Sequence, residues 1–447
     1  MSSVLLVYPY FRPRVDRSRF RFPPLGTAYV AAALRAAGHD VRLLDCTFLR
    51  RDEAERMALA AGAEVVGISC LATLEDDALW LASRLRDRCG ALVAGGPLPT
   101  CAPQKFLGPF DAVVRGEGER TAVELLAALE GGGDAAAVAG VVTGGSAAGP
   151  PSRPFADDLD ELPFPARDLL PNGAYIADGR RRLGAAVTTV MTTRGCPFAC
   201  DFCSNVVFGR SYRARSVDRV LDEVEQALAL GYDRISFADD VFTLQRERVL
   251  RFCDEVGRRR LRFGWECLGR VDGFDTELAR RMREAGCDSV FFGIESGVDG
   301  VLRLMRKETT TAQARRAVWA AHDAGLRAGA FFILCYPGET DDTVLETLRY
   351  VRTLPLDYLG LTVPYPLPGT GLERRVAGSR RRVWRPGRRL LPRHELTYRG
   401  DFSAAKVRVA LLKGRAEFEV GRRLGRFAPA ALELLGPPSE ALFRALP

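Results

Sequence analysis

The sequence predicts an α/β protein with two folding units, an N-terminal doubly wound domain followed by a partial barrel. Two observations predict this class. Short β-branched runs alternate with helical stretches along both halves of the chain, and a stretch rich in Gly, Ala and Pro at 144–151 separates the halves. The length of 447 residues also exceeds what a single hydrophobic core usually serves.

The first half of the chain predicts a mainly parallel sheet with helices on both faces. Helices are expected at 27–37, where Gly38 supplies a left-handed cap, and at 75–88, which has acidic residues in its first turn. The expected strands are 4–8, 40–45, 64–69, 91–95 and 111–115. We therefore place the Rossmann-like domain at 1–145, followed by a linker and proline-rich extended strap at 146–182.

The second half repeats a strand and helix pattern six times. Strands are expected at 187–193, 234–238, 263–267, 289–294, 330–334 and 358–363. Helices between them are expected at 217–230, 244–258, 276–285, 311–324 and 341–354. Six repeats are too few for a closed eight-fold barrel, so the pattern predicts a laterally open partial (β/α)6 barrel at 183–370. The remainder, 371–447, is expected to be a short, mainly helical, arginine-rich extension.

Charge and cysteine content narrow the class of protein. The net charge is +8, and only four of the 64 basic residues are lysines. Arginine clusters at 374–375, 380–382 and 388–389 could hold a phosphate, an acidic substrate or a nucleic acid, or form a solvated face. The composition is that of a globular protein without a membrane span, and the N-terminus resembles a first strand and not a signal peptide, so we expect a cytoplasmic protein. Eleven cysteines do not suggest a disulfide framework.

Three cysteines stand apart from the others, because Cys196, Cys200 and Cys203 lie within eight residues directly after the first barrel strand. Three thiolates at this spacing can hold a [4Fe-4S] cluster and leave the fourth iron open to a substrate. From the residues alone, two other interpretations exist: buried core cysteines, or a zinc site with a fourth ligand from elsewhere.

With Phe202 before the last cysteine, this CxxxCxxC loop resembles the radical S-adenosylmethionine superfamily. The preceding α/β domain resembles that of its cobalamin-binding members, the class B methyltransferase-like enzymes. The resemblance implies a catalytic [4Fe-4S] cluster on Cys196, Cys200 and Cys203, with S-adenosylmethionine chelating the open iron and cobalamin as a further cofactor. An external electron donor of the flavodoxin or ferredoxin type is the implied partner.

The same resemblance implies a set of S-adenosylmethionine contacts at the strand ends of the barrel: Phe202, Asp240, Arg270, Glu295 and Ser296. The alternatives are a helix N-cap for the paired Asp239 and Asp240, and a surface salt bridge for Arg270. Cys335 replaces a glycine that relatives usually carry in the fifth-strand segment.

Three loops after successive strands of the first domain resemble the cobalamin-binding pattern. The implied contacts are Ser69, Leu71, Thr73, Gly95, Gly96, Pro97, Thr100, Gly116, Glu117, Gly118 and Glu119. Leu98 replaces a histidine of many relatives, and the one histidine of this domain, His39, lies in a turn before a strand. We therefore expect cobalamin to bind without a histidine ligand and with a residue near Leu71 covering the lower face of the metal.

The predicted function is methyl transfer to an unactivated carbon, or to phosphorus, of a small biosynthetic intermediate. A second hypothesis keeps both cofactors but makes the protein a cyclase or rearrangement enzyme of porphyrin, lipid or specialised metabolism. Two hypotheses from other classes are a nucleic-acid modifier, suggested by the arginine clusters, and a non-catalytic cobalamin-binding module. The cysteine loop argues against the module, because a carrier has no use for an open iron.

Overall fold

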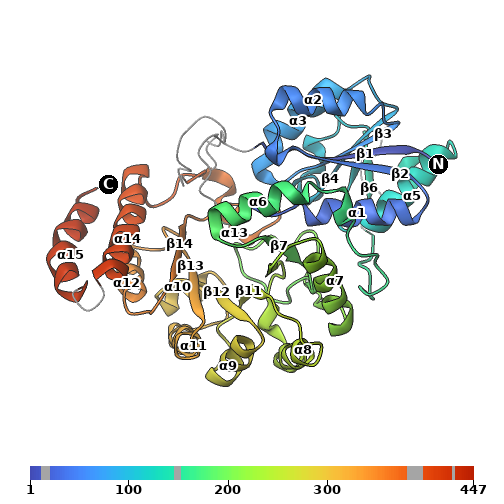
Figure 1. Ribbon diagram of the computed structural model, residues 1–447. Coiled ribbons are helices and arrows are strands. Elements are labelled where there is room, and N and C mark those ends of the chain that lie inside the picture. Colours follow the sequence, from blue (N-terminus) through green and yellow to red (C-terminus); the bar gives the residue numbers. More distant parts are fainter. Residues whose placement is uncertain (12–20, 145–152, 380–395, 425–427, 447) are drawn as a thin grey trace. The chain divides into compact units, whose positions relative to one another are not determined.

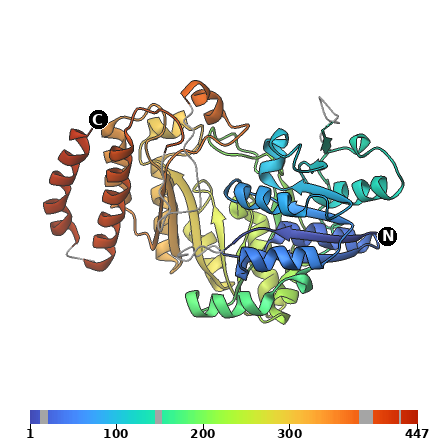
Figure 2. The same cartoon turned by 90° about the horizontal axis from the view of Figure 1, so that it is seen from above.

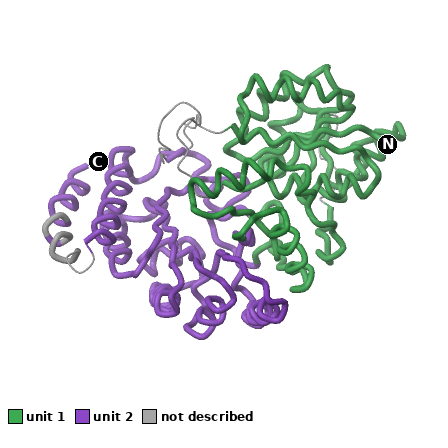
Figure 3. Tube along the Cα trace, viewed as in Figure 1, with its two compact units in different colours: residues 1–196, 205–235 green, residues 197–204, 236–447 purple. Residues whose placement is uncertain are grey.

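The computed structural model describes residues 1–11, 21–144, 153–379, 396–424 and 428–446 (Figure 1). These residues form two compact units: unit 1 comprises 1–196 and 205–235, and unit 2 comprises 197–204 and 236–447 (Figure 3). The stretch at 144–151 that we expected to separate the halves lies almost entirely outside the described residues. So do the arginine clusters at 380–382 and 388–389.

Unit 1 contains a six-stranded sheet in the spatial order β2, β1, β3, β4, β5, β6. Its strands are β1 (Ser3–Tyr8), β2 (Asp40–Asp45), β3 (Val65–Ser69), β4 (Ala91–Gly95), β5 (Ala112–Val114) and β6 (Val141–Thr143). The first five pair in parallel, as predicted, and β6 pairs antiparallel with β5. The prediction lacks β6.

Helices cover both faces of this sheet, and alternate residues of the interior strand β1 point to opposite sides. Leu5 and Val7 belong to a core that includes residues of α2 (Arg51–Ala60) and α3 (Glu75–Leu85). Val4 and Leu6 belong to a second core that includes residues of α1 (Leu25–Ala36) and α5 (Gly118–Glu130). Two apolar cores on opposite faces confirm the doubly wound fold.

Unit 1 also holds the elements that lead into the second half of the chain: α6 (Asn172–Leu183), β7 (Val187–Val190), β8 (Thr193–Arg194), β9 (Arg213–Ala214) and α7 (Val217–Ala229). This region differs from the predictions in two places. The proline-rich strap is followed at once by helix α6, because Pro171 ends the proline run and proline is tolerated at a helix start. The predicted strand at 187–193 ends at Val190, and β8 pairs antiparallel with β9.

The second sheet has the order β14, β13, β12, β11, β10, β7 and, within the described residues, its two edge strands do not pair with each other. This open sheet is the partial barrel that the six repeats predict. The boundary between the units falls within β10 (Arg234–Phe237), and the parallel strands of unit 2 are β11 (Gly264–Gly269), β12 (Cys287–Glu295), β13 (Arg327–Ile333) and β14 (Tyr358–Thr362).

The helices of unit 2 begin and end within three residues of their predicted limits. They are α8 (Arg246–Arg258), α9 (Thr276–Glu284), α11 (Thr311–Asp323) and α12 (Asp341–Val351), with a short α10 (Asp299–Leu304) added after β12. Side-chain caps mark the start of α9, α11 and α12: Asp275, Thr310 and Thr340 each accept a hydrogen bond from a backbone N–H of the first turn that follows.

The C-terminal extension is helical, with α13 (Gly371–Val376), α14 (Ala404–Leu424) and α15 (Ala428–Ala445). Helices α14 and α15 pack side by side (Figure 1 and Figure 2), and α14 also packs on β14. A Cβ at Gly414 would lie 2.6 Å from a methyl carbon of Leu361, so this glycine permits the close approach of helix and strand. Among the described helices, none is long and apolar enough to cross a membrane.

A buried carboxylate on α7 ties together three segments of unit 1. The Glu223 side chain is fully buried and accepts hydrogen bonds from Arg167 at 2.5 Å, from Tyr29 at 3.1 Å and from Arg215. Arg167 belongs to the strap, Tyr29 to α1, and Arg215 follows β9. The two guanidinium groups balance the charge that burial would otherwise penalise.

We expect Glu223→Ala to lower the free energy of unfolding by about 3 to 5 kcal/mol, because it leaves two buried guanidinium groups without their carboxylate. The matched control is Glu225→Ala, which removes an exposed carboxylate from the same helix and should change stability by about 0.5 kcal/mol. Chemical denaturation followed by circular dichroism measures both. Equal losses in the two variants would show that the buried network does not stabilise unit 1.

Candidate active site

The cysteine loop begins from a closed stem formed by the ribbon of β8 and β9. Thr193 pairs with Ala214, and Arg194 pairs with Arg213. Beyond the ribbon, the backbone N–H of Cys196 donates to the carbonyl of Gly209 at 3.4 Å. These contacts hold both ends of the loop together inside unit 1.

A glycine is required where the loop leaves the stem. Gly195 has a φ of 83°, and a Cβ at this position would lie 1.9 Å from the carbonyl oxygen of Ser211. The side-chain amide of Asn205 donates to the carbonyl of Cys196 at 3.1 Å, which fixes the peptide that follows the first cysteine. Gly195 and the hydrogen bond from Asn205 therefore fix the backbone before and after Cys196.

The three predicted cluster ligands form no disulfide: Cys196 and Cys200 are partly exposed, and Cys203 is exposed. Three accessible thiols in one loop are a donor set that suits an iron–sulfur cluster. Within the described residues no group of three His, Cys, Asp or Glu side chains is arranged as metal ligands. A bound cluster would supply the positive charge that holds three thiolates together.

Charged side chains of unit 2 surround Cys200. Burial raises the pKa of the Cys200 thiol, and the positive charges of Lys307 and Arg270 oppose that rise. Arg270 follows β11, is buried, and places its guanidinium 3.4 Å from the centre of the Phe198 ring within the cysteine loop. Its Nε donates to Asp272 at 2.7 Å, so Arg270 makes a buried contact to the loop as well as a local ion pair.

Glu295 ends β12 in a left-handed conformation, with a φ of 72°. Its carboxylate lies 3.3 Å from the Nζ of Lys307, and both side chains are buried. A Cβ at Gly293 would lie 2.6 Å from the Glu295 carboxylate and 3.1 Å from the Lys307 Nζ. Gly293 therefore makes room for this ion pair. The sequence did not reveal the pair, because Lys307 lies outside the motif that contains Glu295.

The other three predicted S-adenosylmethionine contacts have different surroundings. Ser296 is fully buried, and its hydroxyl lies 3.1 Å from that of Thr347 on α12. Asp240 is exposed, and desolvation by surrounding atoms, followed by the charge of Asp239, raises its pKa. Phe202 packs on an apolar cluster that includes Tyr336. The structure thus brings Arg270 and Glu295 to the region of Cys200, whereas Ser296 anchors the turn after β12.

Asp201, inside the cysteine loop, is a residue that the sequence analysis did not identify. Its carboxylate accepts a hydrogen bond from the Tyr336 hydroxyl at 2.9 Å and pairs with Arg375 at 2.9 Å. Its backbone N–H donates to Met305, and its carbonyl accepts from Leu372, each at 2.9 Å. Four contacts to three other segments of unit 2 therefore anchor the middle of the loop.

The segment after β13 contains the expected departure at Cys335. This residue is buried and has a φ of 63°, a conformation that favours the glycine of relatives. The nearby Glu339 is also buried, and burial raises its pKa to about 7. Its carboxylate accepts a hydrogen bond from the backbone N–H of Tyr336 at 2.8 Å.

The three predicted cobalamin loops follow β3, β4 and β5, which are neighbours in the sheet of unit 1. Gly96 has a φ of 103°, and a Cβ there would lie 3.0 Å from the carbonyl oxygen of Cys70. The Thr100 hydroxyl donates to the Gly96 carbonyl at 2.8 Å and accepts from the Gly116 N–H at 3.0 Å. The second and third loops are thereby joined at the carboxyl edge of the sheet, where doubly wound domains bind ligands.

Side chains on these loops differ in exposure. Thr73 is exposed, Ser69 and Leu71 are partly exposed, and Leu98 is buried. Gly118 is in close contact with α1, because a Cβ there would lie 3.0 Å from a methyl carbon of Val30. The remaining members of the predicted set, Gly95, Pro97, Glu117 and Glu119, lie at the end of β4 or the start of the helices that follow.

His39 lies at the opposite edge of the same sheet. It directly precedes β2, and its Nδ1 accepts from the backbone N–H of Ser2 at 3.4 Å and lies 3.4 Å from the Glu130 carboxylate. Because β1 and β2 are parallel, this is the amino edge, the full length of a strand away from the three loops.

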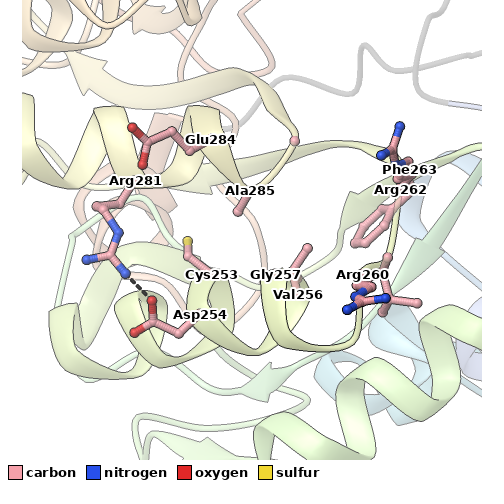
Figure 4. A pocket seen from close by; sticks show the side chains of 12 residues that line it. Cys253, Asp254, Val256, Gly257, Arg260, Arg262, Phe263, Arg281, Glu284 and Ala285 are labelled. Carbon is pink, nitrogen blue, oxygen red and sulfur yellow. Dashed lines mark hydrogen bonds and ion pairs between the residues drawn. The ribbon is translucent and has the colours of Figure 1, made fainter.

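A pocket of about 680 Å³ lies between α8 and α9 of unit 2 (Figure 4). Arg281 on α9 forms an ion pair with Asp254 on α8 beside it. The lining includes the residues that lead into β11 and β12, which places the pocket at the amino ends of these strands. None of the predicted site residues lines it.

Comparisons with known proteins agree with both halves of the predicted architecture. The radical SAM superfamily model matches residues 190–351, and the B12 binding domain model matches residues 12–126. The chain is 36% identical to an uncharacterized methyltransferase of Pyrococcus horikoshii over 83% of this chain and 82% of that protein. It is 29% identical to the anaerobic magnesium-protoporphyrin IX monomethyl ester cyclase of Rubrivivax gelatinosus, over 83% of this chain and 69% of the cyclase.

A solved structure shares the fold over most of the chain. The radical S-adenosylmethionine methyltransferase TsrM from Kitasatospora setae, solved with cobalamin and a [4Fe-4S] cluster bound, superimposes with a TM-score of 0.69 at 22% identity. The match covers 85% of this chain and 76% of that one.

The raised pKa of Glu339 predicts a pH dependence of stability. Its carboxyl is neutral in the folded chain up to about pH 7, but ionises near pH 4.5 when unfolded. The contribution of the Glu339 carboxyl to folding stability is therefore fully present below pH 4.5, and it is lost as the pH rises through 7. We expect the stability of Glu339→Gln to rise relative to wild type by about 3 kcal/mol between pH 4 and 8.

Thermal unfolding at a series of pH values measures this difference. Glu346→Gln, on the exposed side of α12, is the control and should follow wild type at every pH. A constant difference between Glu339→Gln and wild type would show that Glu339 ionises at its ordinary pH in the folded protein.

Proposed function

The chain belongs to the family of cobalamin-binding radical S-adenosylmethionine enzymes, and on this premise we propose that it methylates a small biosynthetic intermediate. Its cofactors are a [4Fe-4S] cluster, S-adenosylmethionine and cobalamin. When bound, these cofactors supply a hydrogen-abstracting radical and a transferable methyl group. We propose an unactivated carbon, or phosphorus, as the acceptor, and an external flavodoxin or ferredoxin as the electron donor.

Within this proposal, the cysteine loop and the charged residues around it bind the first two cofactors. Cys196, Cys200 and Cys203 are the cluster ligands. Arg270 and Glu295 are the contacts to S-adenosylmethionine that the structure supports best, because both are buried and electrostatically close to Cys200. Lys307, which the sequence analysis did not identify, joins them as the partner of Glu295.

Cobalamin is proposed to lie against the loops after β3, β4 and β5. The contacts between Gly96, Thr100 and Gly116 support this location, because small residues held by hydrogen bonds let a flat ligand approach the backbone. Leu71 remains the residue proposed to cover the lower face of the metal. The domain limits proposed from the sequence, 1–145 and 183–370, enclose the residues matched by the two family models.

One observation carries the choice of methyl transfer: His39 lies at the amino edge of the sheet, away from the proposed cobalamin loops. Residues at the carboxyl edge of the sheet would hold cobalamin without this imidazole, and cobalamin bound there would supply the methyl group to be transferred. Cyclisation is the second candidate function, because the chain is also similar to the cyclase of Rubrivivax gelatinosus. The described arginine cluster gives less support to a nucleic-acid substrate, because Arg375 pairs with Asp201 and Arg374 donates to the carbonyl of Gly369.

The absence of a histidine ligand can be tested directly by electron paramagnetic resonance of the chain loaded with cob(II)alamin. We expect no nitrogen superhyperfine splitting from a lower axial ligand. His39→Ala should give the same spectrum and the same cobalamin affinity as wild type, because this imidazole lies at the other edge of the sheet. Nitrogen splitting that disappears in the variant would contradict the proposed binding mode.

The reaction itself is tested by its stoichiometry. Methyl transfer should consume two S-adenosylmethionine molecules per turnover and yield one S-adenosylhomocysteine and one 5′-deoxyadenosine. A trideuteromethyl donor should label the product when intermediates of the neighbouring biosynthetic genes are offered as substrates. Cyclisation would form deoxyadenosine without S-adenosylhomocysteine and leave the product unlabelled.

A control variant separates the chemistry from background reactions. Replacing Cys196, Cys200 and Cys203 with alanine should abolish iron binding and deoxyadenosine formation. The matched variant, Cys89→Ala with Cys101→Ala, removes two partly exposed thiols outside the loop and should retain both.

A further inference from the structure

Two arginines lie directly opposite each other in the stem of the cysteine loop. Arg194 of β8 is the register partner of Arg213 of β9. Like charges at directly opposed positions of an antiparallel pair are destabilising, and both of these side chains are buried almost completely. A ribbon of only two residues on each strand needs a counter-charge at this position to stay paired.

The counter-charge comes from Glu117, in the loop after β5. One carboxylate oxygen of Glu117 accepts from Arg194 at 3.0 Å and from Arg213 at 2.8 Å, so it bridges the two strands of the stem. The other oxygen accepts from the backbone N–H of Ala156 at 2.9 Å. Both carboxylate oxygens of Glu117 therefore accept hydrogen bonds from other residues of unit 1.

Glu119, at the start of α5, provides the second negative charge. Its carboxylate accepts from Arg194 at 2.5 Å and is buried. Burial opposes the charge on Arg194, but Glu119 and then Glu117 outweigh that effect and raise its pKa, so the guanidinium stays charged. Two cations and two anions form a balanced buried group, and all four residues belong to unit 1.

This group lies next to a proposed cluster ligand. Arg194 is separated from Cys196 only by Gly195, which has no room for a side chain. The guanidinium of Arg194 also lies 5.0 Å from the ring centre of Phe208, and that of Arg213 donates to the carbonyl of Phe208 at 3.2 Å. Both strands of the stem thus fix the same residue on the returning side of the loop.

We propose that Glu117 and Glu119 are positioning residues for the iron–sulfur cluster, which hold the stem of the cysteine loop closed and Cys196 in place. In this proposal the carboxylates of Glu117 and Glu119 bind the stem and the strap. This role replaces the cobalamin contact that the resemblance implied for the two side chains, and the backbone of their loop stays available to cobalamin. The inference rests on the proposed role of Cys196 as a cluster ligand. The loop after β5 then serves two cofactors: its backbone can approach cobalamin, and its two carboxylates hold the stem of the cysteine loop.

The test variant is Glu117→Gln, which keeps the shape of the side chain but leaves two buried cations with one anion. We expect iron release from the reconstituted cluster to a chelator to become about tenfold faster or more. The electron paramagnetic resonance signal of the reduced cluster should change, while the cobalamin affinity stays that of wild type. Glu161→Gln is the matched control, because Glu161 pairs with Arg120 at 2.6 Å on the exposed surface.

A second variant separates positioning from general damage to the fold. Glu117→Gln combined with Arg213→Gln restores one cation to one anion, so the repulsion in the stem disappears. We expect this double variant to release iron more slowly than Glu117→Gln alone. A structural defect unrelated to charge would make the double variant worse than either single change.

The outcomes distinguish this inference from the proposed function. If Glu117→Gln weakens cobalamin binding and leaves iron release unchanged, Glu117 is a cobalamin contact and the inference is wrong. The inference also fails if the double variant shows no recovery. A wild-type chain that holds no cluster after reconstitution would instead overturn the proposed function on which the inference rests.

Discussion

The bridge from Glu117 to Arg194 and Arg213 is the interaction on which the geometry of the cysteine loop depends. A loop that presents three thiols to one ligand must leave and re-enter the fold through a fixed stem, and here that stem has only two residues on each strand. So short a ribbon contributes little through its own backbone hydrogen bonds. Its stability comes from charges that are buried and balanced by a carboxylate from a distant loop.

The parallel sheets explain how residues far apart in the sequence reach the same region. Arg270 follows β11 and Glu295 ends β12, and these strands are neighbours, so the two side chains emerge at the same edge. The same rule gathers the loops after β3, β4 and β5 in unit 1 and places His39 at the opposite edge. Fold topology therefore decides which predicted residues can share a ligand.

Local pattern made most of the fold predictable from the sequence. Helices with side-chain caps, such as those beginning after Asp275 and Thr310, were located within a few residues because the cap and the periodic face lie in one window. For the candidate site, short motifs at the strand ends indicated Arg270 and Glu295, and the structure brings both near Cys200. The pairing of Glu117 with Arg194 joins residues 77 positions apart, and no local pattern encodes such a contact.

Lysine use supplies a signal that the sequence analysis did not exploit. The chain uses arginine almost everywhere, yet three of its four lysines are buried and each pairs with a carboxylate: Lys307 with Glu295, Lys406 with Asp341, and Lys413 with Glu417. An ammonium group is compact, whereas a guanidinium fork is planar and wider. At Lys307 the available space is set by Gly293, whose missing side chain leaves room for a point charge beside Glu295. Lys105 differs from these three, because it pairs with Glu75 near the surface. Among the three buried lysines, Lys307 is the one beside the proposed cluster, and there the missing side chain of Gly293 leaves room for a small cation and its carboxylate.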